Sequence, residues 1–159
     1  MIIKYPNPIL TKPTQQFDFN NPFENPIELA VELMKEMNDN NGVGLSANQI
    51  GKPYSIFVLR SHPENIVCFN PKIVNVSHDL IEMEEACLSF PGVNLKIKRP
   101  SQIRLRFQMP SGMTDTKTFD GLTARIVQHE MDHLNGILFI NRANRYHRDK
   151  AMKGYYSGK

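Results

Sequence analysis

The sequence has few cysteines, little net charge and no long apolar run. Two cysteines in 159 residues are too few for the disulfide framework that stabilises small secreted domains. No apolar run approaches the roughly 20 residues that a membrane-spanning helix needs. The N-terminus lacks the basic segment and apolar stretch of a secretory signal. These absences favour a reducing compartment such as the cytoplasm.

Composition and charge describe an ordinary folded protein with a basic end. Hydrophobic residues make up 40% and charged residues 22% of the chain, which excludes wholesale disorder. We expect residues 1–159 to form a single domain, because two smaller ones would bury too little apolar surface. The net charge of +3 is uneven: residues 141–159 contain six basic residues and one acidic, whereas residues 1–140 contain 13 basic and 15 acidic. Any anionic partner is therefore expected at this short basic tail.

The first part of the chain predicts an extended arm, a helix and several strands. Five prolines within the first 26 residues predict the arm. Apolar residues at helical spacing predict a helix from about Ile27, with Asn25 as its N-cap. Alternating or β-branched residues predict strands over residues 54–59, 66–69, 72–76, 93–97 and 102–107.

Helical periodicity returns near the end of the chain. It predicts a helix over residues 122–134, with Asp120 able to cap its start and Gly136 placed to end it. A short second helix is expected near residues 143–153, and residues 155–159 are expected to fray. The order of elements indicates an α+β fold.

The strongest local motif is His129-Glu130-Met131-Asp132-His133. Four residues are just over one helical turn, so His129 and His133 project from one face and can bind one metal ion. Glu130 lies beside them and can act as a general base toward a metal-bound water. The alternative is a helix that carries two histidines by chance, one of them buried and hydrogen-bonded.

A third metal ligand has to come from elsewhere in the chain. His147 lies in the basic tail, where positive charge disfavours a divalent cation. Cys87, as a thiolate, would complete a site with two imidazoles and leave a fourth position for water. The alternative for Cys87 is a buried structural cysteine, which is our interpretation of Cys68 in its apolar strand.

Residues 42–51 form a segment rich in small residues. They would let the backbone approach a ligand closely, and Gln49 offers both an amide donor and an acceptor. The segment lacks the Lys-Ser/Thr ending of a phosphate-binding loop. Taken alone, it is equally consistent with a tight loop after the first helix.

Together, in this order, the three segments resemble the peptide deformylase family. The family carries Gly-x-Gly-Leu-Ala-Ala-x-Gln, Glu-Gly-Cys-Leu-Ser and Gln-His-Glu-x-Asp-His segments. Here they stand as residues 42–49 (Gly-Val-Gly-Leu-Ser-Ala-Asn-Gln), residues 85–89 (Glu-Ala-Cys-Leu-Ser) and residues 128–133 (Gln-His-Glu-Met-Asp-His). Residues 5–10 are also similar to the family's N-terminal arm, so the resemblance runs from about residue 3 to residue 140.

The resemblance implies a metal-dependent hydrolase that removes the N-formyl group from the N-terminal methionine of new proteins and releases formate. It implies an α+β fold with small antiparallel β-sheets packed around a central metal-binding helix. The expected metal is Fe²⁺, with Zn²⁺, Ni²⁺ or Co²⁺ as substitutes. The metal ligands implied by the resemblance are Cys87, His129 and His133.

The resemblance also assigns roles around the metal. Glu130 takes a proton from the metal-bound water, which attacks the formyl carbon, and later passes it to the leaving amine. Gln49 and the backbone N–H of Leu88 hold the formyl oxygen as it becomes an oxyanion. The substrate-binding residues that it implies are Val43, Gly44, Glu85 and Ala86, with the peptide pairing as an added strand.

Further expectations concern partners and location. Such a protein would work in the bacterial cytoplasm, or in the host cytoplasm if phage-encoded; an organelle is less expected, because no transit peptide is seen. We expect a monomer, with weak ribosome contact through the basic tail. Ala86 replaces a family glycine and would be strained if that position needs a positive φ. Ser46 replaces an alanine, which we interpret as conservative.

Two other functions share part of this pattern. A zinc endopeptidase of the His-Glu-x-x-His type would use the same helix but would have no use for Cys87 or Gln49. A deformylase-like protein without activity could use its basic tail to bind RNA, although the presence of Glu130 argues against it. Loss of metal binding on substitution of Cys87 separates the first from a deformylase, and formate release separates the second.

Overall fold

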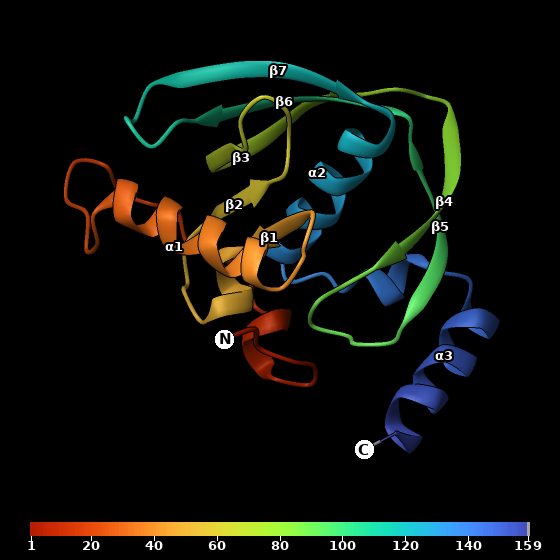
Figure 1. The fold of residues 1–159 in the computed structure, drawn as a ribbon. Coiled ribbons are helices and arrows are strands. Elements are labelled where there is room, and N and C mark those ends of the chain that lie inside the picture. Colours follow the sequence, from red (N-terminus) through yellow and green to blue (C-terminus); the bar gives the residue numbers. More distant parts are fainter. Residues whose placement is uncertain (159) are drawn as a thin grey trace.

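Two antiparallel sheets flank helix α2 (Gly121–Leu134) in the computed structural model, which describes residues 1–158 (Figure 1). The five-stranded sheet has the order β1 (Gly44–Ser46), β2 (Ile56–Leu59), β3 (Ile66–Val76), β6 (Gln102–Gln108) and β7 (Thr114–Asp120). The two-stranded sheet pairs β4 (Leu80–Ala86) with β5 (Asn94–Pro100). The expected α+β fold, with small antiparallel sheets around a central helix, is confirmed.

Helix α1 (Pro26–Asp39) begins where the sequence predicts. The Asn25 side chain accepts hydrogen bonds from the N–H groups of Ile27 (2.9 Å) and Glu28 (3.1 Å), so the predicted N-cap is confirmed. The buried face of α1, with Leu33 and Met37 fully enclosed, packs in one cluster with residues of β1 and β2. The helix therefore fixes the segment that follows it, which contains the glycine-rich residues.

The strands differ from the prediction in extent. The predicted strands 66–69 and 72–76 form one strand, β3, because the irregularity at Asn70 (φ +48°) is a bulge in the pairing with β6. β1, β4 and β7 were not predicted. β1 is very short, and the alternation of apolar and polar residues in β4 covers only residues 81–84 before Glu85 takes an inward position, so both lack the longer pattern by which the other strands were found.

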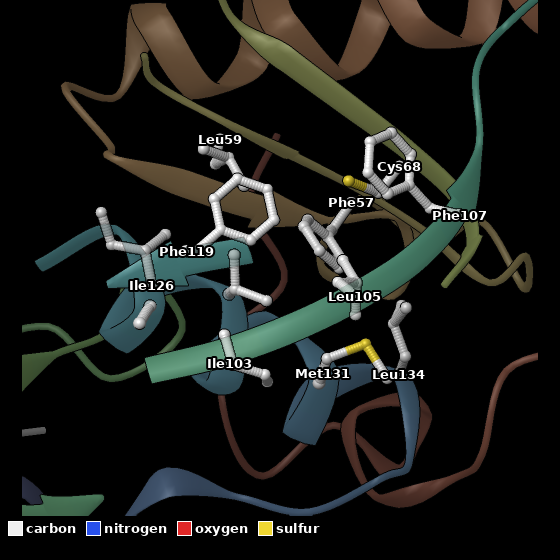
Figure 2. Packing of buried hydrophobic residues seen from close by; sticks show 12 residues of the cluster. Phe57, Leu59, Cys68, Ile103, Leu105, Phe107, Phe119, Ile126, Met131 and Leu134 are labelled. Carbon is white, nitrogen blue, oxygen red and sulfur yellow. The ribbon is translucent and has the colours of Figure 1, made fainter. Parts of the chain in front are cut away.

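Helix α2 packs against the five-stranded sheet through an apolar cluster (Figure 2). Ile126, Met131 and Leu134 of the helix contact this cluster, which also includes the fully buried Cys68. The interpretation of Cys68 as a core residue is confirmed. The helix ends before Gly136, whose φ is +71° and whose missing Cβ would lie 2.7 Å from the carbonyl oxygen of Thr11.

The start of α2 and the last helix depart from the prediction. Asp120 occupies the N-cap position of α2, but its side chain makes no capping hydrogen bond. Helix α3 spans Arg145–Ser157, so the expected fraying of residues 155–157 is wrong; residue 159 lies outside the described residues. The hydroxyl of Tyr155 donates to the carbonyl oxygen of Tyr5 (2.9 Å), which ties the helix to the N-terminal arm. Within residues 1–158, no helix is long and apolar enough to cross a membrane.

Candidate metal centre and catalytic cleft

Helix α2 brings His129 and His133 together with Cys87, the residue after β4. The ligand atoms of these three side chains lie within 4.8 Å of one another, and all three residues are buried. Cys87 Sγ is 3.3 Å from His133 Nε2. A thiol and two imidazoles at this spacing suit one divalent transition metal and leave room for a fourth ligand. The donor set therefore fits a single metal ion.

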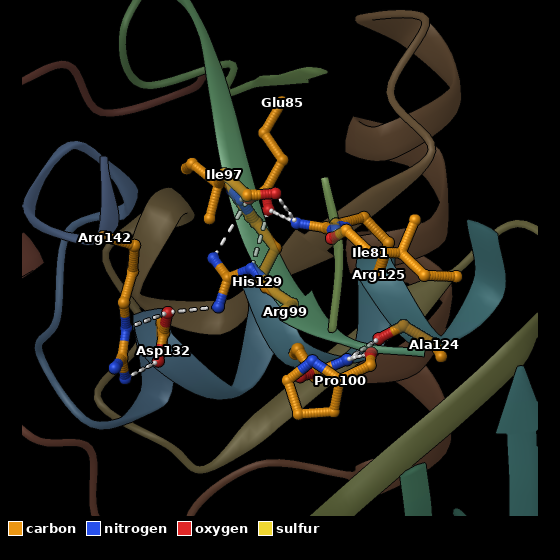
Figure 3. A network of polar contacts seen from close by, with 11 residues as sticks. Ile81, Glu85, Ile97, Arg99, Pro100, Ala124, Arg125, His129, Asp132 and Arg142 are labelled. Atoms are coloured by element: carbon orange, nitrogen blue, oxygen red, sulfur yellow. Dashed lines mark hydrogen bonds and ion pairs between the residues drawn. The ribbon is translucent and has the colours of Figure 1, made fainter. Parts of the chain in front are cut away.

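A buried carboxylate orients the first histidine. Glu85 Oε1 is 2.9 Å from His129 Nδ1 (Figure 3). The other ring nitrogen of His129 is thereby left for Cys87. Glu85 also accepts hydrogen bonds from Arg99 (2.6 and 3.0 Å) and Arg125 (2.8 Å). Burial alone would raise the pKa of Glu85, but the hydrogen bonds from His129 and Arg99 outweigh it and lower the pKa to about 2. The carboxylate thus stays ionised and holds the ring in place.

The same network continues to the end of the chain. Arg99 Nη1 donates to Asp132 Oδ2 (2.8 Å), and Asp132 also accepts from Arg142 Nε (3.1 Å) and Nη2 (2.8 Å) (Figure 3). Arg99 and Asp132 are buried, whereas the side chain of Arg142 is about half exposed. A chain of charged hydrogen bonds therefore links the segment before α3 to His129.

Glu130 lies in the cleft beside the three candidate ligands. Its Oε2 is buried and has no hydrogen-bond partner among the described residues. Burial raises the pKa of Glu130 to about 7, although the nearby His129 and His133 act against this rise. A Cβ at Gly44 would lie 2.7 Å from Glu130 Oε1 and 2.8 Å from Ile126 Cγ2, so only glycine leaves room for the carboxylate. The carboxylate can therefore accept and donate a proton.

Gln49 points its amide nitrogen at Cys87, and its amide oxygen is held by hydrogen bonds. Its Nε2 is 3.6 Å from Cys87 Sγ and 3.1 Å from Ser89 Oγ. Its Oε1 accepts from the backbone N–H of Ser46 (3.0 Å) and from Ser46 Oγ (3.0 Å). Ser46 Oγ is also 2.7 Å from Asn48 Oδ1, and Asn48 Nδ2 donates to the carbonyl oxygen of His133 (2.8 Å). Ser46, which we interpreted as a conservative replacement for alanine, therefore takes part in positioning Gln49.

A cleft of about 420 Å³ opens onto these groups. It lies between β1, an edge strand of the larger sheet, and β4 of the smaller one. The cleft contains the site residues that the sequence singled out: Val43, Gly44, Gln49, Glu85, Ala86, Cys87, Leu88, His129 and Glu130. His133 does not line the cleft itself, but its Nε2 lies 3.3 Å from Cys87 Sγ. The structure thus brings every predicted site residue to one place.

Two details of the cleft refine the sequence analysis. Among the described residues only Asn41, Asn70 and several glycines have a positive φ, so Ala86 is not strained. Ala86 instead ends β4 opposite Asn94 and is one of the residues that line the cleft. The carboxylate of Glu85 is occupied by the arginines and His129, which leaves its backbone to meet a ligand.

Sequence reasoning missed the residues that support the site. Arg99, Arg125, Asp132 and Arg142 each look like a surface charge in the sequence, and Asn48 looks like a loop residue. Asp132 stands inside the histidine motif, and this is the one signal that could have pointed to a supporting role. The partners that give these residues their function come from distant parts of the chain.

Comparison with known proteins gives a consistent result. A family model described as polypeptide deformylase matches residues 1–149. A peptide deformylase of Borreliella burgdorferi is 35% identical over 156 residues, which cover 97% of this chain and 93% of the relative. That of Aquifex aeolicus is 35% identical over 160 residues, with the same coverage.

Solved structures agree with the sequence relatives. A Plasmodium falciparum peptide deformylase superposes with a TM-score of 0.91 at 31% identity, covering 99% of this chain and 94% of that one. A deformylase from Synechococcus elongatus in complex with actinonin superposes with a TM-score of 0.89 at 30% identity, covering 98% and 85%.

Proposed function

The chain belongs to the peptide deformylase family and is a deformylase, and from that premise we propose how it acts: it releases formate from the N-formyl-methionyl end of new proteins by metal-dependent hydrolysis. One observation carries the proposal. Cys87, His129 and His133 converge on one point beside a carboxylate, Glu130, whose Oε2 has no partner among the described residues.

Cys87, His129 and His133 would hold the metal ion. We expect this ion to be Fe²⁺, with Zn²⁺, Ni²⁺ or Co²⁺ as substitutes. When bound, the ion supplies a Lewis acid that makes a water molecule nucleophilic at neutral pH. The zinc endopeptidase alternative gains no support, because the third candidate ligand is Cys87, upstream of the helix, and such an enzyme would have no use for it.

Glu130 takes a proton from the attacking water at its Oε2 and returns it to the amine that leaves. Oε2 has no competing hydrogen-bond partner among the described residues, and Gly44 leaves the space in which the carboxylate can reach the reacting atoms. General acid–base catalysis of this kind contributes on the order of 10²–10⁴-fold in rate.

Gln49 and the backbone N–H of Leu88 stabilise the formyl oxygen as negative charge develops on it. Ser46 holds the Gln49 amide with its nitrogen directed to the centre, so little reorganisation is needed during the reaction. Loss of one such donor costs on the order of 3 kcal/mol in the barrier.

The substrate lies in the cleft as an added strand. Val43 and Gly44 on one side and the backbone of Glu85 and Ala86 on the other offer it edge-strand positions, since β1 and β4 are both edges of their sheets. The methyl group of Ala86 narrows the cleft at the position where the family has glycine. We therefore expect a preference for small residues after the methionine.

Four further expectations belong to this proposal. The enzyme acts in the cytoplasm as a monomer, residues 1–159 form one catalytic domain, and the basic residues 141–159 make a weak contact with the ribosome. Cosedimentation with ribosomes at low and high salt tests that contact, because an electrostatic contact weakens with salt.

The experiment that tests the activity is anaerobic formate release from formyl-Met-Ala-Ser by protein loaded with Fe²⁺ or Ni²⁺. We expect release that stops on chelation and returns when metal is added back, with acetyl-Met-Ala-Ser as the control that is not hydrolysed. Absence of formate from protein with confirmed bound metal would contradict the proposed function.

A further inference from the structure

A second and larger hollow adjoins the catalytic cleft. It measures about 1620 Å³ and lies between α3 and the outer face of the β4–β5 hairpin, which run beside each other in Figure 1. Glu82, Glu84, Lys96 and Lys98 line it from the hairpin. The α3 side includes His147, Lys150, Ala151 and Gly154. We call this hollow the α3 groove.

The α3 groove is continuous with the catalytic cleft. Lys4, Glu84, Pro91 and Gly92 line both hollows. The catalytic cleft, at about 420 Å³, has the size of a site for a small ligand and holds only the first residues of a polypeptide. A longer substrate must leave it along the surface, and the α3 groove is a surface that begins at its rim.

Positive charge predominates in the α3 groove. Five cationic side chains line it, against two carboxylates; the cations are Lys4, Lys96, Lys98, Arg142 and Lys150, and the anions Glu82 and Glu84. Among the described residues, Arg142 pairs with Asp132, whereas Lys96, Lys98 and Lys150 form no ion pair. Lys96 and Lys98 lie opposite Glu84 and Glu82 in the strand register without pairing closely with them. The groove therefore has cations available for an anionic ligand.

The geometry points to the α3 groove as the binding site for the part of the substrate that follows the residues held in the catalytic cleft. The groove favours acidic side chains in this part of the substrate. This inference rests on the proposed function, because it takes the catalytic cleft to hold the formyl-methionyl end. It adds a specificity site to the enzyme, formed by Lys96, Lys98 and Lys150.

A peptide fits this surface better than RNA does. Glu82 and Glu84 stand on the hairpin next to Lys98 and Lys96 in the cross-strand register, and their carboxylates would repel a phosphate backbone. A peptide with separated acidic side chains can reach the lysines individually, and its neutral backbone does not suffer this repulsion. Continuity with the catalytic cleft also favours the same polypeptide as occupant.

The test compares formate release from three extended substrates. Each begins with formyl-Met-Ala-Ser and continues with three glutamates, three glutamines or three lysines, separated from one another by alanine. For the metal-loaded wild type at low salt, we expect kcat/KM in the order acidic, neutral, basic. Each step is expected to be on the order of two- to fivefold, as for exposed ion pairs, and to shrink in high salt.

Two matched variants locate the effect. Lys150→Glu places an acidic residue in the groove, whereas Lys153→Glu makes the same change three positions along α3, outside the lining residues. We expect Lys150→Glu to remove or reverse the preference for the acidic peptide and Lys153→Glu to keep it. Lys98→Gln, on the hairpin, should weaken the preference with the helix untouched. All variants should cleave formyl-Met-Ala-Ser as the wild type does.

The inference is overturned if the wild type treats the three extended peptides alike. It is also overturned if Lys153→Glu and Lys150→Glu act equally, since the effect would then come from net charge. Direct binding, measured by fluorescence anisotropy with labelled acidic peptide and with labelled single-stranded RNA, gives a readout without catalysis. If Lys150→Glu weakens only RNA binding, the occupant is RNA and the inference is wrong. If formyl-Met-Ala-Ser itself is not cleaved, the proposed function fails, and anisotropy still decides whether the groove prefers acidic peptide.

Discussion

The carboxylate of Glu130 lies against the backbone of Gly44, where a Cβ would come within 2.7 Å of Oε1. The glycine thereby fixes where the carboxylate can stand. Its neighbours in the cleft are Ile126 of the same helix and the candidate metal ligands.

Gly44→Ala should displace this carboxylate and lower kcat on formyl-Met-Ala-Ser at least about tenfold, since a misplacement of about 1 Å can cost on the order of 10² in rate. The metal content should stay unchanged. The matched control is Gly154→Ala in α3, where a Cβ meets nothing within 4 Å. That change should leave the activity on the tripeptide intact and stabilise the protein by about 0.5–1 kcal/mol. Equal activity of the two variants would show that Gly44 leaves no required space.

Ser46→Ala should lower the free energy of unfolding by about 1–3 kcal/mol, because it leaves the buried Oδ1 of Asn48 without its 2.7 Å partner. Activity should fall only modestly, because the backbone N–H of Ser46 still holds Gln49 Oε1. Urea unfolding of the variant, beside the control Ser61→Ala, measures the effect. Matching midpoints for the two variants would contradict it.

Glu85 gives the fold a dependence on acid. Its pKa is lowered from 4.5 to about 2, so its stabilising effect is complete above pH 4.5 and is lost as the pH falls toward 2. The shift corresponds to roughly 3 kcal/mol of stability. Unfolding of the metal-free protein between pH 6 and 3 should show the loss. Glu85→Gln should be less stable at pH 6 and flatter across this range; an unchanged slope in that variant would assign the acid sensitivity to other groups.

Arg142→Ala should speed the loss of metal, because Asp132 would then keep only Arg99 among its partners in the described residues. Arg99 would then hold Glu85, the partner of His129, less firmly. We expect a dissociation rate up to about tenfold higher, measured by transfer of Co²⁺ or Zn²⁺ to a chelator. Arg142→Lys keeps the charge without the paired hydrogen bonds and should lie between. Arg145→Ala is the control, since among the described residues the only ion pair of Arg145 is with the exposed Asp149. A rate for Arg142→Ala equal to that of the control would remove Arg142 from the metal site.

The parts of the molecule that the sequence predicted are those with a repeating pattern. Helix α2 and its two histidines follow from a period of 3.6 residues, and β6 follows from strict alternation. Cys87 was placed with them by the order of three motifs. Local signals of this kind need no knowledge of tertiary contacts.

The missing parts depend on contacts between distant residues. Arg99 and Asp132 are 33 positions apart, and both are buried as members of one ion-pair network that also includes Glu85 and Arg142. The β4 strand is acidic along the chain, yet Glu85 faces inward to Arg99 and Arg125 while Glu82 and Glu84 stay on the outer face. Neither fact can be derived from composition or spacing alone.

Formate release by Glu130→Gln tests the central claim most directly. The substitution keeps the shape of the side chain and removes its ability to take a proton. With metal content equal to that of the wild type, we predict a fall in kcat on formyl-Met-Ala-Ser of at least about 10²-fold. Wild-type activity in the metal-loaded variant would contradict the account.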